Sequence, residues 1–173
     1  MTRRIASLQF LDVCSLPLAE VFRYWDGKRG GRAMPLRAEI DPNELRRHLP
    51  GITLVDVKRE PLDFVYRLIG TREVAARGYD PTGKRVAENW FGANSQDVVS
   101  NYERVVASRS FLYDKEAFTK PDGRRVVDES LFLPLALPED EAAVAQIMVY
   151  SHYGDSWAGS RPSARKLLPV LDE

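Results

Sequence analysis

The residues of this chain that could carry out catalysis or bind a metal are few and widely separated. The single cysteine, Cys14, lies near the N-terminus, and the two histidines, His48 and His152, lie far apart in the sequence. A metal site needs several ligands at short spacing, and nucleophilic catalysis needs a Ser, Cys or Thr beside a base. Neither pattern is present, and there is no Gly-x-Ser-x-Gly motif. We therefore expect no metal, no cofactor and no catalytic residue.

Two adjacent acids, Asp128 and Glu129, are the remaining candidates for proton chemistry. They lie in the middle of a predicted strand, where successive side chains face opposite sides, so one could point inward while the other meets solvent. A buried acid would have a raised pKa and could act as a proton-transfer base. The simpler interpretation is a structural pair with an arginine such as Arg67 or Arg125.

Length and composition restrict the class of protein. The 173 residues are 44% hydrophobic, which suits one domain with a real core. Twenty-five basic residues balance twenty-five acidic ones, so no excess charge favours nucleic acid as a partner. The N-terminus is unlike a secretory signal, and the longest apolar run, 131–138, is too short to cross a membrane. We expect a cytoplasmic protein with no membrane partner.

The segment 17–29 has the spacing of an amphipathic helix, and Gly30 and Gly31 supply its end. Its apolar stripe must be buried, either on the open face of the chain's own sheet or on the same helix of a second copy. We predict a homodimer, with this segment as the candidate dimer helix. The stripe consists of Leu18, Val21, Phe22 and Trp25.

The rest of the chain is predicted to form short helices and antiparallel strands. Capping residues and apolar spacing predict helices at 41–48, 71–77 and 95–108. β-Branched runs bounded by turn residues predict strands at 52–57, 64–69, 112–119, 125–135 and 143–153, with a turn at 120–123. This order predicts an α+β domain with an antiparallel sheet and an added N-terminal helical segment.

Local motifs add a family resemblance to this order of elements. They are Arg23-Tyr24-Trp25, Gly30-Gly31-Arg32, Met34-Pro35, Ile40-Asp41-Pro42 and the run Phe64-Val65-Tyr66-Arg67-Leu68-Ile69-Gly70-Thr71. Together they resemble a stand-alone bacterial PAS family, of the kind found in alphaproteobacteria, over about residues 17–153. The resemblance implies a five-stranded antiparallel sheet with flanking helices that enclose a small pocket. It divides the chain into an extension (1–16), a helical segment (17–50), a PAS core (51–155) and a tail (156–173).

Two cofactors that PAS domains use are not expected here. Flavin photochemistry uses a cysteine in an Asn-Cys-Arg setting on a central helix, whereas Cys14 precedes the fold. Haem needs an axial ligand on the helix over the pocket, and neither His48 nor His152 lies in such a helix.

Aromatic side chains are the better candidates for a ligand pocket, although each could simply belong to the core. Alternation along the strand would turn Phe64, Tyr66 and Leu68 inward and Arg67 outward. Tyrosines are favoured because a buried hydroxyl needs a hydrogen-bond partner. The candidate pocket residues are Phe64, Tyr66, Leu68, Trp90, Tyr102 and Tyr113.

Three functions remain open from the sequence. The first is a noncatalytic sensor or adaptor that binds a small molecule, a regulatory protein, or both. The second is an interaction or dimerisation module with a filled core and no ligand. The third is a small enzyme that uses Asp128 or Glu129 as a base in a curved-sheet cavity. In the first case the output would pass through another protein, with 161–173 as one possible contact.

Overall fold

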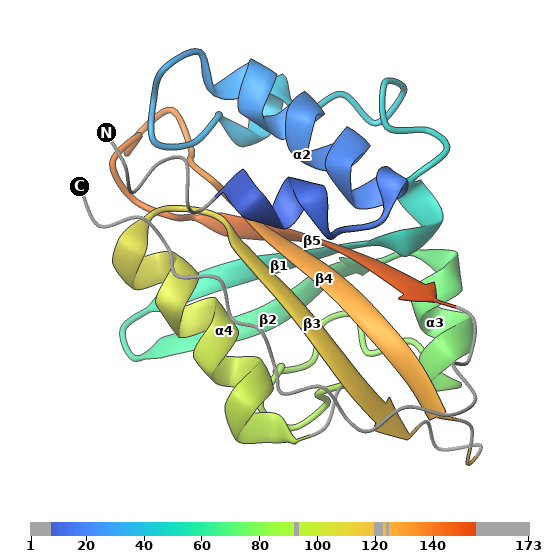
Figure 1. Ribbon diagram of the computed structural model, residues 1–173. Coiled ribbons are helices and arrows are strands. Elements are labelled where there is room, and N and C mark those ends of the chain that lie inside the picture. Colours follow the sequence, from blue (N-terminus) through green and yellow to red (C-terminus); the bar gives the residue numbers. More distant parts are fainter. Residues whose placement is uncertain (1–7, 92–93, 120–122, 124, 155–173) are drawn as a thin grey trace.

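The computed structural model describes residues 8–91, 94–119, 123 and 125–154, which form one antiparallel sheet flanked by helices (Figure 1). The sheet order is β2-β1-β5-β4-β3. The fold is therefore the five-stranded PAS-like α+β arrangement that the sequence predicts. The strands are β1 (Ile52–Arg59), β2 (Leu62–Ile69), β3 (Leu112–Thr119), β4 (Arg125–Leu135) and β5 (Gln146–Gly154); the helices are η1 (Gln9–Asp12), α2 (Leu16–Arg29), η2 (Arg37–Glu39), η3 (Leu49–Gly51), α3 (Thr71–Arg77) and α4 (Ser95–Ser108).

Helices cover the sheet on both faces (Figure 1). We call the face under α3 and α4 the inner face; there Tyr102 of α4 contacts Phe132 of β4. We call the opposite face, under η1 and α2, the outer face; there Phe10 of η1 stacks on Tyr113 of β3. Because strand residues alternate between faces, each central strand supplies side chains to two separate layers of core.

The apolar stripe of α2 packs on the chain's own sheet. All four of its predicted stripe residues are buried, and α2 lies against β4 and β5. The indole Nε1 of Trp25, which is 1% exposed, donates a hydrogen bond to the Pro134 carbonyl at 2.9 Å. Burial of each such side chain contributes roughly 1.5–3 kcal/mol. The structure thus places Leu18, Val21, Phe22 and Trp25 in the intrachain core, where none of them is free to meet a second copy.

A β-bulge corrects the expected direction of Leu68. The pairing of β1 with β2 shifts between Leu54, which faces Leu68, and Val55, which faces Tyr66. Arg67 is therefore the extra residue, and the alternation along β2 changes phase there. Leu68 lies on the outer face with 50% of its surface exposed, so the prediction that it points inward with Phe64 and Tyr66 is wrong.

The predicted helix at 41–48 is instead a series of turns that ends in η3. The Asp41 carboxylate accepts a hydrogen bond from the Asn43 amide, two residues on, as in an Asx turn, so it does not cap a helix. The predicted helix 95–108 agrees with α4, which Asn94 caps, whereas β5 begins at Gln146 rather than at 143. Most of the predicted turn at 120–123 and the whole tail 156–173 lie outside the described residues.

Candidate functional site

The inner face brings together three of the six predicted pocket residues. Phe64 and Tyr66 project from β2, and Tyr102 projects from α4. The rings of Phe64 and Tyr102 lie 5.2 Å apart, and Tyr102 meets Phe132 edge-on at 5.1 Å. These contacts make an apolar layer between the sheet and α4, as expected for packed aromatic side chains.

The other predicted pocket residues lie elsewhere. Tyr113 is buried on the outer face, where its ring stacks on Phe10 at 5.3 Å and its hydroxyl donates to Glu129 at 3.1 Å. Trp90 follows the turns after α3 and is 39% exposed. Leu68 faces outward because of the bulge. Tyr113 and Leu68 therefore lie on the face of the sheet opposite Phe64, Tyr66 and Tyr102.

A cluster of polar side chains lies beside this aromatic layer on β4 and β5. Asp128 and Ser130 of β4 pair in register with Tyr153 and Ser151 of β5. The Ser130 hydroxyl lies 2.7 Å from Asp128 Oδ2 and 2.8 Å from the Ser151 hydroxyl. Asp128 Oδ1 is buried and has no hydrogen-bond partner among the residues that the structure describes.

The neighbouring elements contribute two further acids to the inner face. Glu73 of α3 is 2% exposed, and its carboxylate accepts a hydrogen bond from the Tyr153 hydroxyl at 2.6 Å. Asp114 of β3 is also buried and accepts a hydrogen bond from the Asn101 side chain at 2.7 Å. Since β3 pairs with β4, Asp114 lies opposite Ser130. Three carboxyl groups from three elements therefore gather in one layer of the core.

Arg77 supplies the positive charge on this face. Its guanidinium lies over the rings of Tyr66 and Phe91, at 5.0 and 4.9 Å, which favours a cation. It also donates to the Tyr66 hydroxyl at 3.4 Å and the Asn89 carbonyl at 3.3 Å. Its Nε atom is buried and has no partner in the described part of the chain.

Burial determines the protonation of these groups. Desolvation raises the pKa of Asp128 well above its usual range, and the nearby Glu73 charge raises it further. Desolvation likewise raises the pKa of Tyr153, with the carboxyl groups of Asp128 and Glu73 adding to the shift. A protonated carboxyl both donates and accepts hydrogen bonds. The inner face therefore has the chemistry to recognise a polar ligand group, and a buried acid with a raised pKa can also exchange protons.

Glu129 lies on the outer face, so the two acids alternate as the strand predicts. Its carboxylate accepts hydrogen bonds from the Ser15 amide at 2.9 Å and from Lys115 Nζ at 2.8 Å. Burial raises the pKa of Glu129, but the hydrogen bonds from Lys115 and Ser15 outweigh burial and lower it overall. Glu129 is buried, and its partner is a lysine rather than Arg67 or Arg125, which corrects the expected arginine pair.

The histidines hold structural positions. His48 is buried between Glu20 of α2, 3.2 Å from its Nε2, and the Tyr150 hydroxyl, 3.4 Å from its Nδ1. Burial lowers its pKa, which favours the neutral ring. His152 pairs in register with Glu129 on β5 and β4. Among the described residues, no three His, Cys, Asp or Glu side chains form a group that could hold a metal ion.

The polar inner face is the part of the site that sequence reasoning largely missed. Of its members only Asp128 was singled out, and the relevant signal was in the strands themselves. Asp114 and Ser130 occupy positions whose alternate neighbours, Leu112 and Phe132, are buried on the same face. Polar residues at inward positions of a strand are uncommon unless a partner satisfies them. Glu73 and Arg77 gave no comparable signal because α3 is too short to define a face.

Comparisons with known proteins agree with this architecture. The sequence matches a family described as PAS domain over residues 13–148. No curated protein matches it. The fold is similar to a light-oxygen-voltage domain studied with a flavin analogue, with a TM-score of 0.50, 11% identity, and coverage of 65% of this chain and 83% of that chain.

Two further structures have lower scores. VqmA bound to DPO gives a TM-score of 0.49 at 12% identity and covers 64% of this chain; this chain spans only 56% of that one. The Rhodobacter sphaeroides LOV protein gives a TM-score of 0.46 at 12% identity, with coverage of 66% of this chain and 68% of that one.

None of the described helices is long and apolar enough to span a membrane. The sheet order, the helices over the inner face and a family match over most of the sequence all agree. The chain belongs to the PAS domain family and is a sensory signalling domain.

Proposed function

We propose that this PAS domain is a noncatalytic sensor that binds a small molecule on the inner face, between the sheet and the helices α3 and α4. One observation carries the proposal: Asp128 Oδ1 and Arg77 Nε are buried on this face without hydrogen-bond partners in the described chain. Buried polar atoms in proteins are nearly always satisfied, and an unsatisfied one costs about 1–3 kcal/mol. A ligand that bonds to both atoms would offset this cost.

The chemistry of the face restricts the ligand. Arg77 donates, and the Asp128 carboxyl, whose pKa is raised, would both donate and accept in its protonated form, so the ligand would carry at least one acceptor. Phe64, Tyr66 and Tyr102 would contact its apolar part. Because both unpartnered atoms are out of contact with solvent, entry would require α3 or the turns at 79–91 to move. Through such a movement, a ligand would change the surface that a partner protein binds.

The test is native mass spectrometry of the purified protein, followed by denaturing extraction of any small molecule it retains. We expect a stoichiometric compound, and we expect the Asp128→Ala variant to lose it. The matched control is Glu103→Gln, which changes an exposed acid on α4 away from the polar cluster. A folded protein that carries no compound, and whose thermal stability no candidate ligand raises, would contradict the sensor proposal.

A ligand-free interaction module is the second candidate, and the packing of Phe64, Tyr102 and Phe132 favours it. These rings already fill the layer under α4 without a ligand. An empty protein that still binds a regulatory partner would support this candidate. In either case we infer a cytoplasmic domain that acts through protein partners rather than nucleic acid, because its charges balance. The predicted homodimer would have to use surfaces other than the α2 stripe.

A further inference from the structure

His48 lies where three elements of the fold meet. It immediately precedes η3 and is 7% exposed. Its ring meets the ring of Tyr150 of β5 edge-on at 5.4 Å, and its Nε2 lies beside Glu20 of α2. The guanidinium of Arg72, in α3, lies over the Tyr150 ring at 5.5 Å. The His48 side chain therefore joins α2 to the sheet, close to the start of α3.

The Nε2 atom of His48 has two neighbours with opposite requirements. Arg47 Nε donates a hydrogen bond to it at 3.2 Å, which requires a lone pair on Nε2. Glu20 Oε2 also lies 3.2 Å from it, and a hydrogen bond to that carboxylate requires a proton on Nε2. One nitrogen cannot meet both requirements at once. The protonation of the ring therefore determines which of the two neighbours it bonds to.

The neutral ring satisfies Arg47. When Nε2 accepts from Arg47, the ring proton lies on Nδ1, where it can donate to the Tyr150 hydroxyl 3.4 Å away. Arg47 then contacts two partners, because its Nη2 also pairs with Glu20 Oε1 at 2.9 Å. A second proton, placed on Nε2, would set two N–H groups and two positive charges against each other. Protonation of the ring therefore displaces Arg47.

The surrounding charges and the exposure of each group favour this exchange. Burial lowers the pKa of His48 below its ordinary value of 6.5; the Glu20 carboxylate raises it, and the cations Arg47 and Arg72 lower it. The Arg47 side chain is 73% exposed, so it can turn into solvent at little cost, whereas Glu20 is 28% exposed and stays beside the ring. Histidine is the residue type whose charge changes in this pH range.

We propose that His48 is a pH-sensitive switch that exchanges the partner of Glu20. At neutral pH, Arg47 bridges Glu20 and the ring. In mild acid the ring takes a proton from solvent and bonds to Glu20 through Nε2, and Arg47 turns into solvent. The exchange changes how α2 is held to the segment before β1 and frees a cation at the surface. It gives the domain an input that does not depend on a ligand at the inner face.

The first test is NMR of the whole protein, labelled with ¹⁵N in histidine and arginine and titrated from about pH 8 to pH 5. The chain has only two histidines, so His48→Gln assigns the ring signals. We expect the neutral His48 ring to carry its proton on Nδ1 and to titrate below pH 6.5. The Arg47 Nε–H signal should change with the same midpoint. A neutral ring with its proton on Nε2, or an Arg47 signal that does not follow His48, would overturn the proposal.

Two substitutions should move the His48 midpoint in opposite directions. Arg47→Ala removes a cation and a hydrogen bond to the neutral ring, so the midpoint should rise by about 0.5–1 pH unit. Glu20→Gln removes the anion that the protonated ring binds, so the midpoint should fall by a similar amount. Arg46→Ala, which removes an exposed cation one position earlier, should have much less effect. Equal midpoints in wild type and in both variants would contradict the exchange.

Urea unfolding measures the switch in a second way. Because the folded pKa of His48 is lowered, its contribution to stability is present above 6.5 and is lost as pH falls through the folded value. Wild type should therefore lose free energy of unfolding relative to His48→Gln between about pH 7.5 and pH 5. Parallel curves for these two proteins would count against the switch. Asp128→Ala should keep the His48 titration, so failure here and failure at the inner face are distinguishable.

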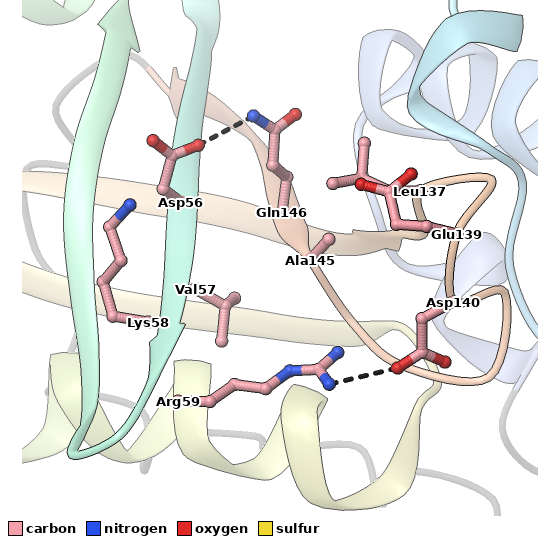
Figure 2. Close-up of a pocket in the computed structure, with 9 residues that line it drawn as sticks. All are labelled: Asp56, Val57, Lys58, Arg59, Leu137, Glu139, Asp140, Ala145 and Gln146. Carbon is pink, nitrogen blue, oxygen red and sulfur yellow. Dashed lines mark hydrogen bonds and ion pairs between the residues drawn. The ribbon is translucent and has the colours of Figure 1, made fainter.

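An exposed ion pair elsewhere on the domain supplies the matched control. Arg59 and Asp140 pair at 3.1 Å across one end of a surface groove, as Figure 2 shows. None of the described residues that line this groove is a histidine. Asp140→Asn removes the pair and should leave the difference between wild type and His48→Gln unchanged when it is added to both.

Discussion

Asp128 and Glu129 are neighbours in β4, yet their carboxyl groups lie on opposite faces of the sheet. Asp128 faces the inner polar cluster, where burial raises its pKa, whereas hydrogen bonds to Glu129 on the outer face lower the pKa of that group. The same functional group, on two neighbouring residues of one strand, thus takes opposite pKa shifts from its surroundings. This contrast gives two predictions about how the free energy of unfolding depends on pH, and the two have opposite signs.

Replacing Asp128 by Asn should flatten the dependence of stability on pH. A carboxyl whose pKa is raised in the folded protein binds its proton more tightly there than in the unfolded chain, whose value is near 3.8. Its contribution to stability is therefore present below that value and is lost as pH rises toward the folded pKa. Urea unfolding from pH 4 upward should show wild type losing free energy of unfolding relative to Asp128→Asn. Parallel curves for the two proteins would mean that Asp128 is ionised in the folded state.

Replacing Glu129 by Gln should destabilise the protein by about 1–3 kcal/mol near pH 7. The carboxylate holds the Ser15 amide at the start of α2 and pairs with Lys115. Because its folded pKa is lowered, its contribution is present above the unfolded value of 4.5 and is lost as pH falls through the folded pKa. Urea unfolding should therefore show a difference that shrinks in acid. Glu103→Gln serves as the control and should change stability by less than about 0.5 kcal/mol.

At the scale of elements, the sequence predicts the strands better than the relations between them. The bounds of β3, β4 and α3 agree with apolar spacing and turn residues, because these signals are local. The bulge that turns Leu68 outward depends on how β1 pairs with β2, and the sequence of neither strand alone determines that pairing. The same limit applies to Tyr113, because the face that β3 presents to the helices depends on its register with β4.

Gly70 lies at the junction between β2 and α3, and we expect its replacement by alanine to destabilise the protein strongly. An added Cβ there would lie 2.4 Å from the Pro50 carbonyl oxygen and 2.5 Å from that of Leu49, and both are backbone atoms that cannot rotate away. The Gly70 amide also donates to the Ile52 carbonyl, which fixes the junction to the start of β1. We expect Gly70→Ala to lower the free energy of unfolding by about 2–3 kcal/mol, measured by urea titration.

Gly27 provides the matched control for the same substitution. It lies within α2, and an added Cβ would meet no atom within 4 Å. Alanine restricts the unfolded chain and favours a helix, so Gly27→Ala should raise stability by roughly 0.5–1 kcal/mol. If both variants changed stability in the same direction, the close approach at Gly70 would not be the cause.

For the whole molecule, α2 is an integral part of the core rather than an appendage. It covers the outer face while α3 and α4 cover the inner one, so the sheet is enclosed between two layers of helix (Figure 1). The sequence left open whether the α2 stripe meets its own sheet or a second copy, because amphipathic spacing identifies a buried face but not what covers it. The structure places the stripe on β4 and β5 of the same chain.

Trp25→Ala tests this arrangement. The indole is almost fully buried and donates a hydrogen bond to Pro134, so its loss should cost about 3–5 kcal/mol. Because the contacts are within one chain, the loss in free energy of unfolding should be the same at low and high protein concentration. If α2 were exchanged between two copies, the cost would instead grow with concentration, since only the dimer would contain the contact. Urea unfolding over a wide range of concentrations, with the oligomeric state followed by light scattering, separates the two arrangements.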